Sequence, residues 1–313
     1  MKLRAASVNS NDISIRNGVP GVQIGFPHII GSDGAGIIVA TGTGVRNVKP
    51  GDAVTLYPAS GCGVCQFCLT DREYLCAGVS LIGERESGTY AEYVRLDARN
   101  CFLIPAELSF EEAAAVPVVF ITAWQMLMTN AELKPGESVL IRGIQGGFAT
   151  AALQLSISMC SDVIVTDEGE DQLATAKKLG AKHAIDERDV DVSQEVRKLT
   201  GKRGVDVVVD CVGGKGWVKS LAALAKGGRL VTCGASAGAD PQTDVRRIFW
   251  NYLKVFGSTL GTREDFRRVL NFFSRSRTKP LIDQVFSLRD ADQAQQRLAE
   301  GKHLGKIILR MDP

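Results

Sequence analysis

Four cysteines lie within one fifteen-residue segment of the chain. The spacing is Cys62-x-x-Cys65-x-x-Cys68, and Cys76 follows after seven further residues. Two-residue spacers let successive thiolates turn toward one point, and four thiolates complete the tetrahedral shell that zinc prefers in structural sites. Because a filled shell leaves no position for water or substrate, we expect one structural zinc whose binding orders this loop. Two disulfides, or cysteines that have this spacing by chance, are the rival interpretations of the same residues.

The remaining cysteines favour free thiols. They are isolated in apolar surroundings at Cys101, Cys160, Cys211 and Cys233. The opening Met1-Lys2-Leu3-Arg4 is not followed by the apolar core and cleavage site of a signal peptide, and no apolar stretch is long enough to cross a bilayer. We therefore expect a soluble protein in a reducing compartment, the cytoplasm.

A glycine-rich turn follows a buried strand predicted over residues 138–142. It contains Gly143, Gly146 and Gly147, and Phe148 comes next as an apolar helix begins. Gly143 allows the tight turn, the next two glycines let the backbone approach a pyrophosphate, and the start of the helix supplies N–H groups. Ala149 stands where such a fingerprint usually ends in glycine, so the match is imperfect.

An acidic residue strengthens the prediction of a dinucleotide site. Asp167 ends the next strand, twenty residues beyond Gly147, where a carboxylate accepts hydrogen bonds from both ribose hydroxyls. Its charge repels a 2′-phosphate, which favours NAD over NADP. The alternative is that Glu168, Glu170 and Asp171 simply stabilise the start of the next helix.

Two later strand ends carry further candidates for cofactor binding. Cys211-Val212-Gly213-Gly214 and Cys233-Gly234-Ala235 follow predicted strands of the same sheet. Ligands bind at this edge in such folds, so Val212 and Gly234 are candidate cofactor contacts. Ordinary turn glycines are an equally good interpretation.

Size and charge limit the possible partners. The chain has 313 residues, of which 45% are hydrophobic, and 37 Lys and Arg against 35 Asp and Glu leave a net charge of +2. Such a length predicts two cores. Because no block of like charge is long enough to hold a phosphate backbone or an anionic membrane, we expect a small-molecule substrate and neither nucleic acid nor membrane as partner.

The order of elements changes along the chain. To about residue 115 we expect short strands at 36–40, 53–57 and 90–94, which indicate a compact β-rich domain. A capping box at Ser109 and Glu112 opens a helical stretch to Met128 that Pro117 should interrupt. Thereafter strands at 138–142, 162–166, 205–210, 229–233 and 254–258 alternate with helices from 147 and at 170–179 and 215–226, which predicts a doubly wound parallel sheet. Helices at 263–274 and 289–300 precede a last strand at 306–309.

Taken together, these motifs resemble the zinc-type medium-chain dehydrogenase/reductase superfamily, which contains alcohol dehydrogenases and quinone oxidoreductases. Further matching pieces are Gly31-Ser32-Asp33-Gly34-Ala35-Gly36, Lys49-Pro50-Gly51-Asp52, Gly88-Thr89-Tyr90-Ala91-Glu92-Tyr93 and Gly305-Lys306. The resemblance implies a GroES-like catalytic domain over 1–118 with the zinc lobe at 62–76, a Rossmann NAD(P)-binding domain over 119–261, and a C-terminal return over 262–313. It also implies Lys306 as a cofactor-binding residue and a homodimer or homotetramer.

The chain departs from that family where a catalytic zinc would bind. The places of the Cys, His and Cys ligands are taken by Asn9, Ser32 and Val118, beside the acid Asp33. These side chains do not form a zinc shell, and none of His28, His183 and His303 falls at the expected place; we interpret His28 as structural. The proton-relay positions are Asn11 and Ser14, which favours transfer through solvent. Since the family normally begins with additional strands, this sequence is expected to start inside the first domain and to leave a sheet edge exposed.

The resulting hypothesis is an NAD(P)(H)-dependent oxidoreductase that transfers hydride to or from a carbonyl, quinone or activated alkene without a catalytic zinc. By family placement, Asn9, Asn11 and Asp33 line the substrate pocket. Two alternatives stay open: a zinc-dependent alcohol dehydrogenase with an atypical catalytic site, and a nucleotide-binding pseudoenzyme.

Overall fold

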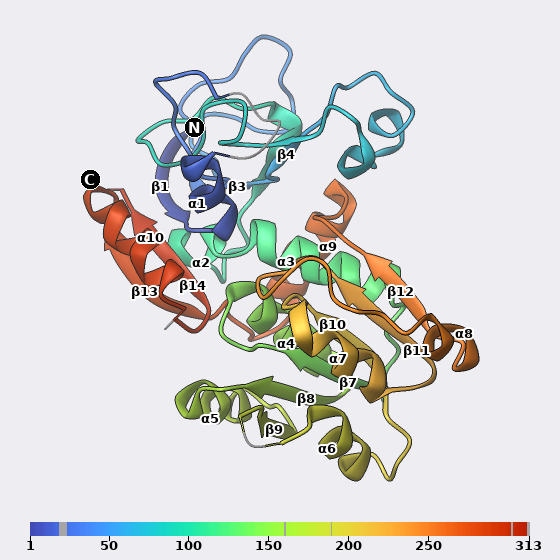
Figure 1. The fold of residues 1–313 in the computed structure, drawn as a ribbon. Coiled ribbons are helices and arrows are strands. Elements are labelled where there is room, and N and C mark those ends of the chain that lie inside the picture. Colours follow the sequence, from blue (N-terminus) through green and yellow to red (C-terminus); the bar gives the residue numbers. More distant parts are fainter. Residues whose placement is uncertain (19–23, 160, 189, 302, 312–313) are drawn as a thin grey trace. The chain divides into compact units, whose positions relative to one another are not determined.

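The structure is a computed structural model that describes residues 1–18, 24–159, 161–188, 190–301 and 303–311 (Figure 1). Cys160, one of the four cysteines expected to be isolated, lies outside the described residues. The chain forms two compact units. Unit 1 comprises Met1–Ile121 and Leu260–Pro313, and unit 2 comprises Thr122–Thr259.

Unit 1 is built on a six-stranded sheet with the order β13-β14-β1-β2-β3-β6. Neighbouring strands are antiparallel except β13 and β14, and the C-terminal strand β14 pairs directly with the N-terminal strand β1. A small two-stranded sheet, β4 with β5, flanks the cysteine segment. The strands are β1 (Lys2–Ser7), β2 (Asp33–Ile37), β3 (Ala53–Leu56), β4 (Ala59–Ser60), β5 (Ser80–Leu81), β6 (Cys101–Leu103), β13 (Ile282–Ser287) and β14 (Lys306–Arg310).

Close backbone packing explains the small residues of β2. A Cβ atom added to Gly36 would lie 2.1 Å from the Lys2 carbonyl oxygen of β1, so only glycine fits there. Beneath the sheet, Leu3, Val54 and Leu309 belong to one buried cluster. The β-rich first domain that the sequence predicts is therefore present.

Two details of that prediction were wrong. The segment 90–94 is not a strand: it follows β1 through the Leu3 N–H to Glu92 oxygen and Val94 N–H to Met1 oxygen hydrogen bonds, with one isolated bridge. The strand expected at 36–40 begins three residues earlier and ends at Ile37, because Asp33–Ile37 is the part that pairs with β1. Helix α1 (Ser10–Asn17), which has mostly polar residues, was not predicted.

The two helices that follow β6 begin at the expected signals. Ser109 and Glu112 form the capping box of α2 (Phe110–Ala114), and α3 (Pro117–Trp124) begins at the proline that was expected to interrupt the helix. A π-helical turn follows at Gln125–Asn130. Near the end of the chain lie α9 (Arg263–Arg275) and α10 (Ala291–Ala299).

Unit 2 contains a parallel six-stranded sheet with the order β12-β11-β10-β7-β8-β9, as the alternating pattern predicts. Its strands are β7 (Ser138–Arg142), β8 (Asp162–Asp167), β9 (His183–Asp186), β10 (Val205–Asp210), β11 (Leu224–Thr232) and β12 (Lys254–Gly257). Its helices are α4 (Gly147–Ser158), α5 (Glu170–Lys178), α6 (Val192–Leu199), α7 (Trp217–Ala223) and α8 (Val245–Trp250).

The strand order of unit 2 reverses between β7 and β10, which lie side by side in the middle of the sheet. In open parallel sheets, ligands bind outside the carboxyl ends of the strands at such a reversal. The loops after Arg142 and Asp210 are therefore the part of unit 2 where a ligand is expected to bind. None of the helices in the described ranges is long and apolar enough to span a bilayer.

Candidate functional site

The four cysteines of the lobe converge on one point. The Sγ atoms of Cys62, Cys65, Cys68 and Cys76 all lie within 4.8 Å of one another. The separation is 3.9 Å for Cys62 and Cys68 and 3.6 Å for Cys65 and Cys68. A tetrahedron of sulfurs about 2.3 Å from a central zinc has edges of about 3.8 Å, so these residues fit the ion.

Backbone groups prepare this shell for a cation. The Cys76 sulfur accepts the N–H groups of Cys62 at 3.5 Å and Gly78 at 3.3 Å. Hydrogen bonds from Val64 and Cys65 lower the pKa of Cys62 to about 6. These contacts favour the thiolate form, which zinc requires, at Cys62 and Cys76, whereas burial raises the pKa of Cys68 to about 11. The described cysteines are free thiols, which leaves the disulfide interpretation without support.

One ion pair joins the lobe to the rest of unit 1. Glu73, between Cys68 and Cys76, is buried and pairs with Arg263 at the start of α9. The Arg263 guanidinium also donates to the Asn100 side-chain oxygen at 2.9 Å and lies over the Tyr57 ring at 5.2 Å. The lobe is thus held by a buried charge as well as by its expected metal.

A second buried cluster gathers around Asp33. Its carboxylate, fully buried, accepts hydrogen bonds from Ser7 Oγ at 2.8 Å and Asn9 Nδ2 at 2.9 Å, and from the Val118 N–H at 2.9 Å. The Lys306 ammonium lies 3.2 Å from the same carboxylate and donates to Asn9 Oδ1 at 2.6 Å and the Val8 carbonyl at 2.9 Å. Every polar group of this cluster thus has a partner within unit 1.

The three residues predicted to line the substrate pocket differ in whether their polar atoms are already hydrogen-bonded. Asn9 and Asp33 are buried and use their polar atoms on each other and on Lys306. Asn11, in the first turn of α1, is partly exposed, and its side chain makes no hydrogen bond with any residue that the structure describes. Only Asn11 of the three therefore offers a free amide.

The three places of the absent zinc ligands differ in what they offer. Asn9 is committed to Asp33 and Lys306, while Val118 contributes only its backbone N–H. Ser32 is buried, and its hydroxyl oxygen has no hydrogen-bond partner. A single hydroxyl beside a saturated carboxylate does not fit the donor set of a zinc site. His28 Nε2 donates a 2.9 Å hydrogen bond to the Gly83 carbonyl oxygen.

Asp12 lies beside this cluster in an environment that disfavours its charge. Its Oδ2 accepts from the Asn9 N–H at 2.8 Å and from Tyr90 Oη at 3.0 Å, while Oδ1 has no partner. Burial raises the pKa of Asp12 to about 7. The sequence contained no signal for this pair, because Tyr90 is 78 residues away.

In unit 2, the glycine turn occupies the place where the strand order reverses. Gly143 has φ +69°, a conformation that favours glycine, and a Cβ added there would lie 3.0 Å from Val212. Gly146 is the N-cap of α4, and no side chain caps the first turn formed by Gly147 and Phe148. The N–H groups of a first turn have no acceptor within their own helix, so they are available to an anion.

Asp167 has the position that the sequence predicts but also holds the turn itself. Its Oδ2 accepts from the Ile144 N–H at 2.8 Å, and Oδ1 accepts from the Gln145 side chain and from the N–H groups of Glu168 and Gly169. Glu170 and Asp171 lie in the first turn of α5, as the alternative interpretation supposed. A carboxylate has about four acceptor positions, so Oδ2 keeps room for a further donor.

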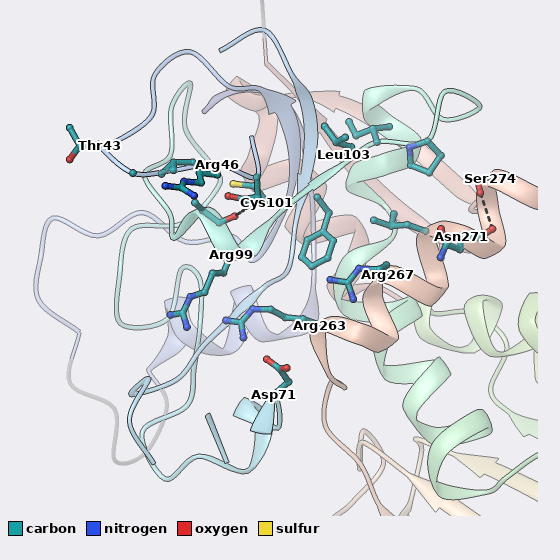
Figure 2. A pocket seen from close by; sticks show the side chains of 18 residues that line it. Thr43, Arg46, Asp71, Arg99, Cys101, Leu103, Arg263, Arg267, Asn271 and Ser274 are labelled. Atoms are coloured by element: carbon teal, nitrogen blue, oxygen red, sulfur yellow. Dashed lines mark hydrogen bonds between the residues drawn. The ribbon is translucent and has the colours of Figure 1, made fainter. Parts of the chain in front are cut away.

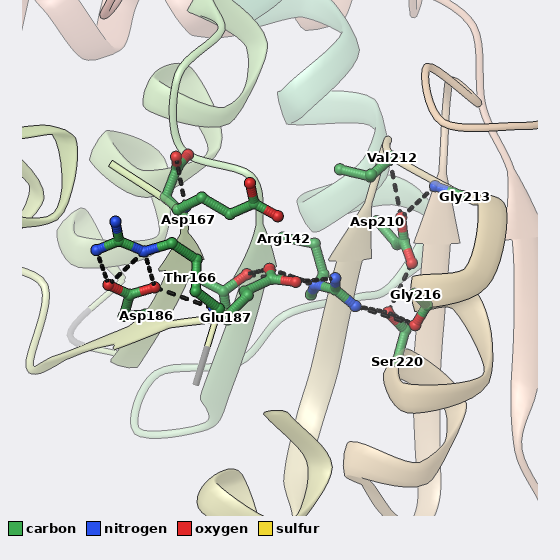
Figure 3. A network of polar contacts seen from close by, with 12 residues as sticks. Arg142, Thr166, Asp167, Asp186, Glu187, Asp210, Val212, Gly213, Gly216 and Ser220 are labelled. Carbon is green, nitrogen blue, oxygen red and sulfur yellow. Dashed lines mark hydrogen bonds and ion pairs between the residues drawn. The ribbon is translucent and has the colours of Figure 1, made fainter. Parts of the chain in front are cut away.

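A buried arginine that the sequence did not predict lies below the turn. Arg142, the last residue of β7, pairs with Glu187 and donates to the Gly216 carbonyl at 3.0 Å and to Ser220 Oγ at 3.2 Å. Ser220 in turn donates to Asp210 at 2.6 Å, and Asp210 accepts the N–H groups of Val212 and Gly213. Figure 3 shows this chain of contacts running beneath the carboxyl ends of the strands. Arg142 therefore positions the loop that carries Val212.

A groove of about 1030 Å³ in unit 1 is lined in part by Arg263 of the lobe's ion pair but lies outside the cluster around Asp33 (Figure 2). Its lining includes Arg46, Arg99, Arg263 and Arg267 but none of Asn9, Asn11 and Asp33. Arg99 pairs with Asp97, Arg263 with Glu73 and Arg267 with Glu264, which offsets most of its positive charge. We therefore do not assign the cofactor or the substrate to it.

The contribution of the pair between Arg142 and Glu187 to stability can be tested by substitution. Glu187→Gln removes one partner of a pair whose side chains are 4% and 17% exposed, and it should lower the free energy of unfolding by about 3 kcal/mol. Urea denaturation followed by tryptophan fluorescence reports this change, since Trp124, Trp217 and Trp250 all lie in unit 2. Glu195→Gln, whose pair with Lys198 is exposed, is the control and should change stability by less than about 0.5 kcal/mol. Equal changes in the free energy of unfolding of the two variants would show that Glu187 is not needed to stabilise the buried Arg142.

The raised pKa of Asp12 predicts that the stability of the folded protein depends on pH. Because its pKa is raised in the folded chain, the folded state keeps a proton that the unfolded state has released, so stability falls as pH rises from about 4 to 7. Asp12→Asn imitates the protonated carboxyl and should raise the melting temperature at pH 8 more than at pH 5, as measured by calorimetry. Asp292→Asn, at an exposed acid in the first turn of α10, is the matched control. A variant that gains nothing at pH 8 would contradict the assignment.

Comparison with known proteins agrees with this architecture. Residues 1–106 match the alcohol dehydrogenase GroES-like domain, and residues 147–275 match the zinc-binding dehydrogenase family. An alcohol dehydrogenase of Geobacillus stearothermophilus is 32% identical over 100% of this chain and 91% of its own length. An NAD-dependent alcohol dehydrogenase of Sulfolobus acidocaldarius is 32% identical over 99% of this chain and 91% of its own.

Solved structures of alcohol dehydrogenases are similar to this chain as well. The crystal structure of an NAD-dependent alcohol dehydrogenase has a TM-score of 0.96 and 37% identity, covering 99% of this chain and 91% of that one. The alcohol dehydrogenase of Aeropyrum pernix has a TM-score of 0.90 and 28% identity, covering 99% and 91%. By its two domains, its cysteine lobe and these relatives, the chain belongs to the zinc-type alcohol dehydrogenase group of the medium-chain dehydrogenase/reductase oxidoreductases.

Proposed function

We propose that this protein transfers hydride between a nicotinamide cofactor and a carbonyl, quinone or activated alkene without a catalytic zinc. The observation that carries the proposal is the cluster around Asp33. Where a metal would need three donors, Asn9 is committed to Asp33 and Lys306, and Val118 has no side-chain donor. The bound nicotinamide supplies the hydride chemistry, and the protein supplies orientation and electrostatics.

In this proposal the residues of unit 1 divide into two roles. Asn11 offers its partly exposed amide to steady a substrate oxygen. Asn9 and Asp33 do not touch substrate; they are positioning residues held by Lys306. Lys306, which the resemblance implies as a cofactor ligand, is buried with three acceptors, so we assign its charge to neutralising Asp33.

In unit 2 we propose that the turn over Gly143, Gly146 and Gly147 holds the pyrophosphate at the start of α4, beside Phe148. Val212 and Gly234 follow β10 and β11 and would line the same edge of the sheet. Asp167 favours NAD, because Oδ2 can accept a ribose hydroxyl and its charge repels a 2′-phosphate.

We also propose a single zinc, in the lobe, and a homodimer or homotetramer. The exposed surface of unit 2 supports the assembly. The edge strand β12 carries Val255, and Phe249, Trp250 and Tyr252 are 59%, 75% and 71% exposed just before it. Aromatic side chains gathered beside an unpaired strand edge are typical of a surface between subunits.

An activity screen tests the proposal. NADH and NADPH oxidation is followed with quinones, enones and aldehydes, before and after treatment with a chelator that removes accessible zinc. We expect turnover with at least one of these classes, unchanged by the chelator as long as the lobe keeps its metal. Activity that is lost with a second zinc would favour the zinc-dependent alternative, and tight NADH binding without turnover would favour the pseudoenzyme.

A single substitution tests the preference for NAD. Asp167→Asn removes the charge and keeps only one of the two acceptor oxygens of the turn. It should reduce the ratio of NADH to NADPH affinity by about tenfold, a loss of about 1.4 kcal/mol of discrimination. Asp171→Asn, at a neighbouring acid in the first turn of α5, is the control and should leave the ratio unchanged. Fluorescence titration with each nucleotide gives both affinities. An unchanged ratio in Asp167→Asn would remove Asp167 from the specificity site.

A further inference from the structure

Two cysteines lie side by side where β10 and β11 end. The strands are parallel neighbours, with Val209 opposite Val231, so Cys211 and Cys233 are opposite each other two residues further on. Their Sγ atoms are 3.2 Å apart. Neither residue belongs to the zinc lobe or to the polar network of Arg142.

Strand spacing allows a bond between them. Adjacent strands lie about 4.8 Å apart, which falls within the range of about 4.4 to 6.8 Å between the Cα atoms of a disulfide. The loops beyond are held together by the Ala237 N–H to Val212 oxygen bond at 2.8 Å and the Gly214 N–H to Gly238 oxygen bond at 3.0 Å. The two sulfurs can therefore approach without rearrangement of the strands.

The two thiols differ in their surroundings. Both side chains are partly exposed, and Cys233 is followed by the exposed run 234–237. Removal from water, together with the neighbouring Cys233 thiol, raises the pKa of Cys211 well above its ordinary value. A reagent in solution should therefore react with Cys233 first. Cys211 should react second, with the adduct formed on Cys233.

We propose that Cys211 and Cys233 form a redox-active dithiol that small disulfides, such as oxidised glutathione, convert to an intramolecular disulfide. The Cys233 thiolate attacks the small disulfide, which yields a mixed disulfide and releases one small thiol. Cys211 then loses its proton to solvent and attacks the Cys233 sulfur, and the second small thiol leaves. Two protein thiols are oxidised and one small disulfide is reduced to two thiols, so atoms and electrons balance.

The bond would also affect the cofactor edge, a consequence that rests on the proposed function. Val212 follows Cys211, and its side chain packs against the Gly143 turn. Drawing Cys211 toward Cys233 shifts Val212 at that turn, so the oxidised protein should bind NADH several-fold more weakly than the reduced protein.

The test uses the zinc-loaded full chain at pH 8 with oxidised glutathione. After acid quenching and alkylation, peptide mass spectrometry should find a peptide linking residues 211 and 233 in the wild type and in the control Cys101→Ser, whose change lies at a buried cysteine of unit 1. Cys211→Ser should stop at a stable glutathione adduct on Cys233, a signature that a merely structural cysteine would not give. Cys233→Ser should form no linked peptide.

Zinc release is followed in parallel, and zinc lost before any 211–233 link forms would count against the proposal, because the lobe would then be the more reactive thiol site. Circular dichroism verifies that each variant folds, and Cys211→Ala replaces Cys211→Ser if it does not. A wild type that retains zinc and forms no 211–233 link would overturn the proposal. A link that forms in a protein that never binds NADH would leave the dithiol established and reject the proposed function instead.

Discussion

The fold of unit 1 depends on a carboxylate that has no contact with water. Asp33 is fully buried, and burying a charge is costly unless its oxygens are paired and hydrogen-bonded. Its partners come from distant parts of the chain: Ser7 at the end of β1, Val118 in the first turn of α3, and Lys306 at the start of β14. The same interactions occupy the polar atoms of Asn9 and leave the Ser32 hydroxyl without a partner among the described residues. One ionic cluster thus joins these distant parts of the chain within unit 1.

Unit 2 also contains a buried charge, which lies below its glycine turn. Arg142 is buried at the carboxyl end of the central strand β7, and Glu187, Ser220 and Asp210 connect it to the backbone of Val212. In each unit this buried charge, Asp33 in unit 1 and Arg142 in unit 2, is paired with the chain's own groups. The first turn of α4, which no side chain caps, and the amide of Asn11 stay open in the described part of the chain. These groups can still bind a ligand, which is why the proposed chemistry is assigned to them.

How far the sequence predicts this molecule depends on the range of each interaction. The cysteine spacing and the limits of β7 and β10 are local signals, so the lobe and the centre of the parallel sheet were predicted. The short strand β9 and the mostly polar helix α1 lack a strong apolar pattern and were missed. Helix α6 was also missed, although its buried residues Val192 and Val196 lie at the helical spacing of four. Lys306 was assigned to the cofactor by resemblance, but no local pattern shows that its ammonium reaches Asn9 and Asp33, more than 270 residues away.

The central claim is that the metal of this protein belongs to the cysteine lobe and that the chemistry proceeds without a second one. Zinc per chain, measured by plasma mass spectrometry on the purified protein and on Cys68→Ser, tests it most directly. We predict one equivalent in the wild type and a loss of nearly all of it in the variant. Two equivalents in the wild type, with one retained in Cys68→Ser, would show that a second zinc binds outside the lobe and would contradict this prediction.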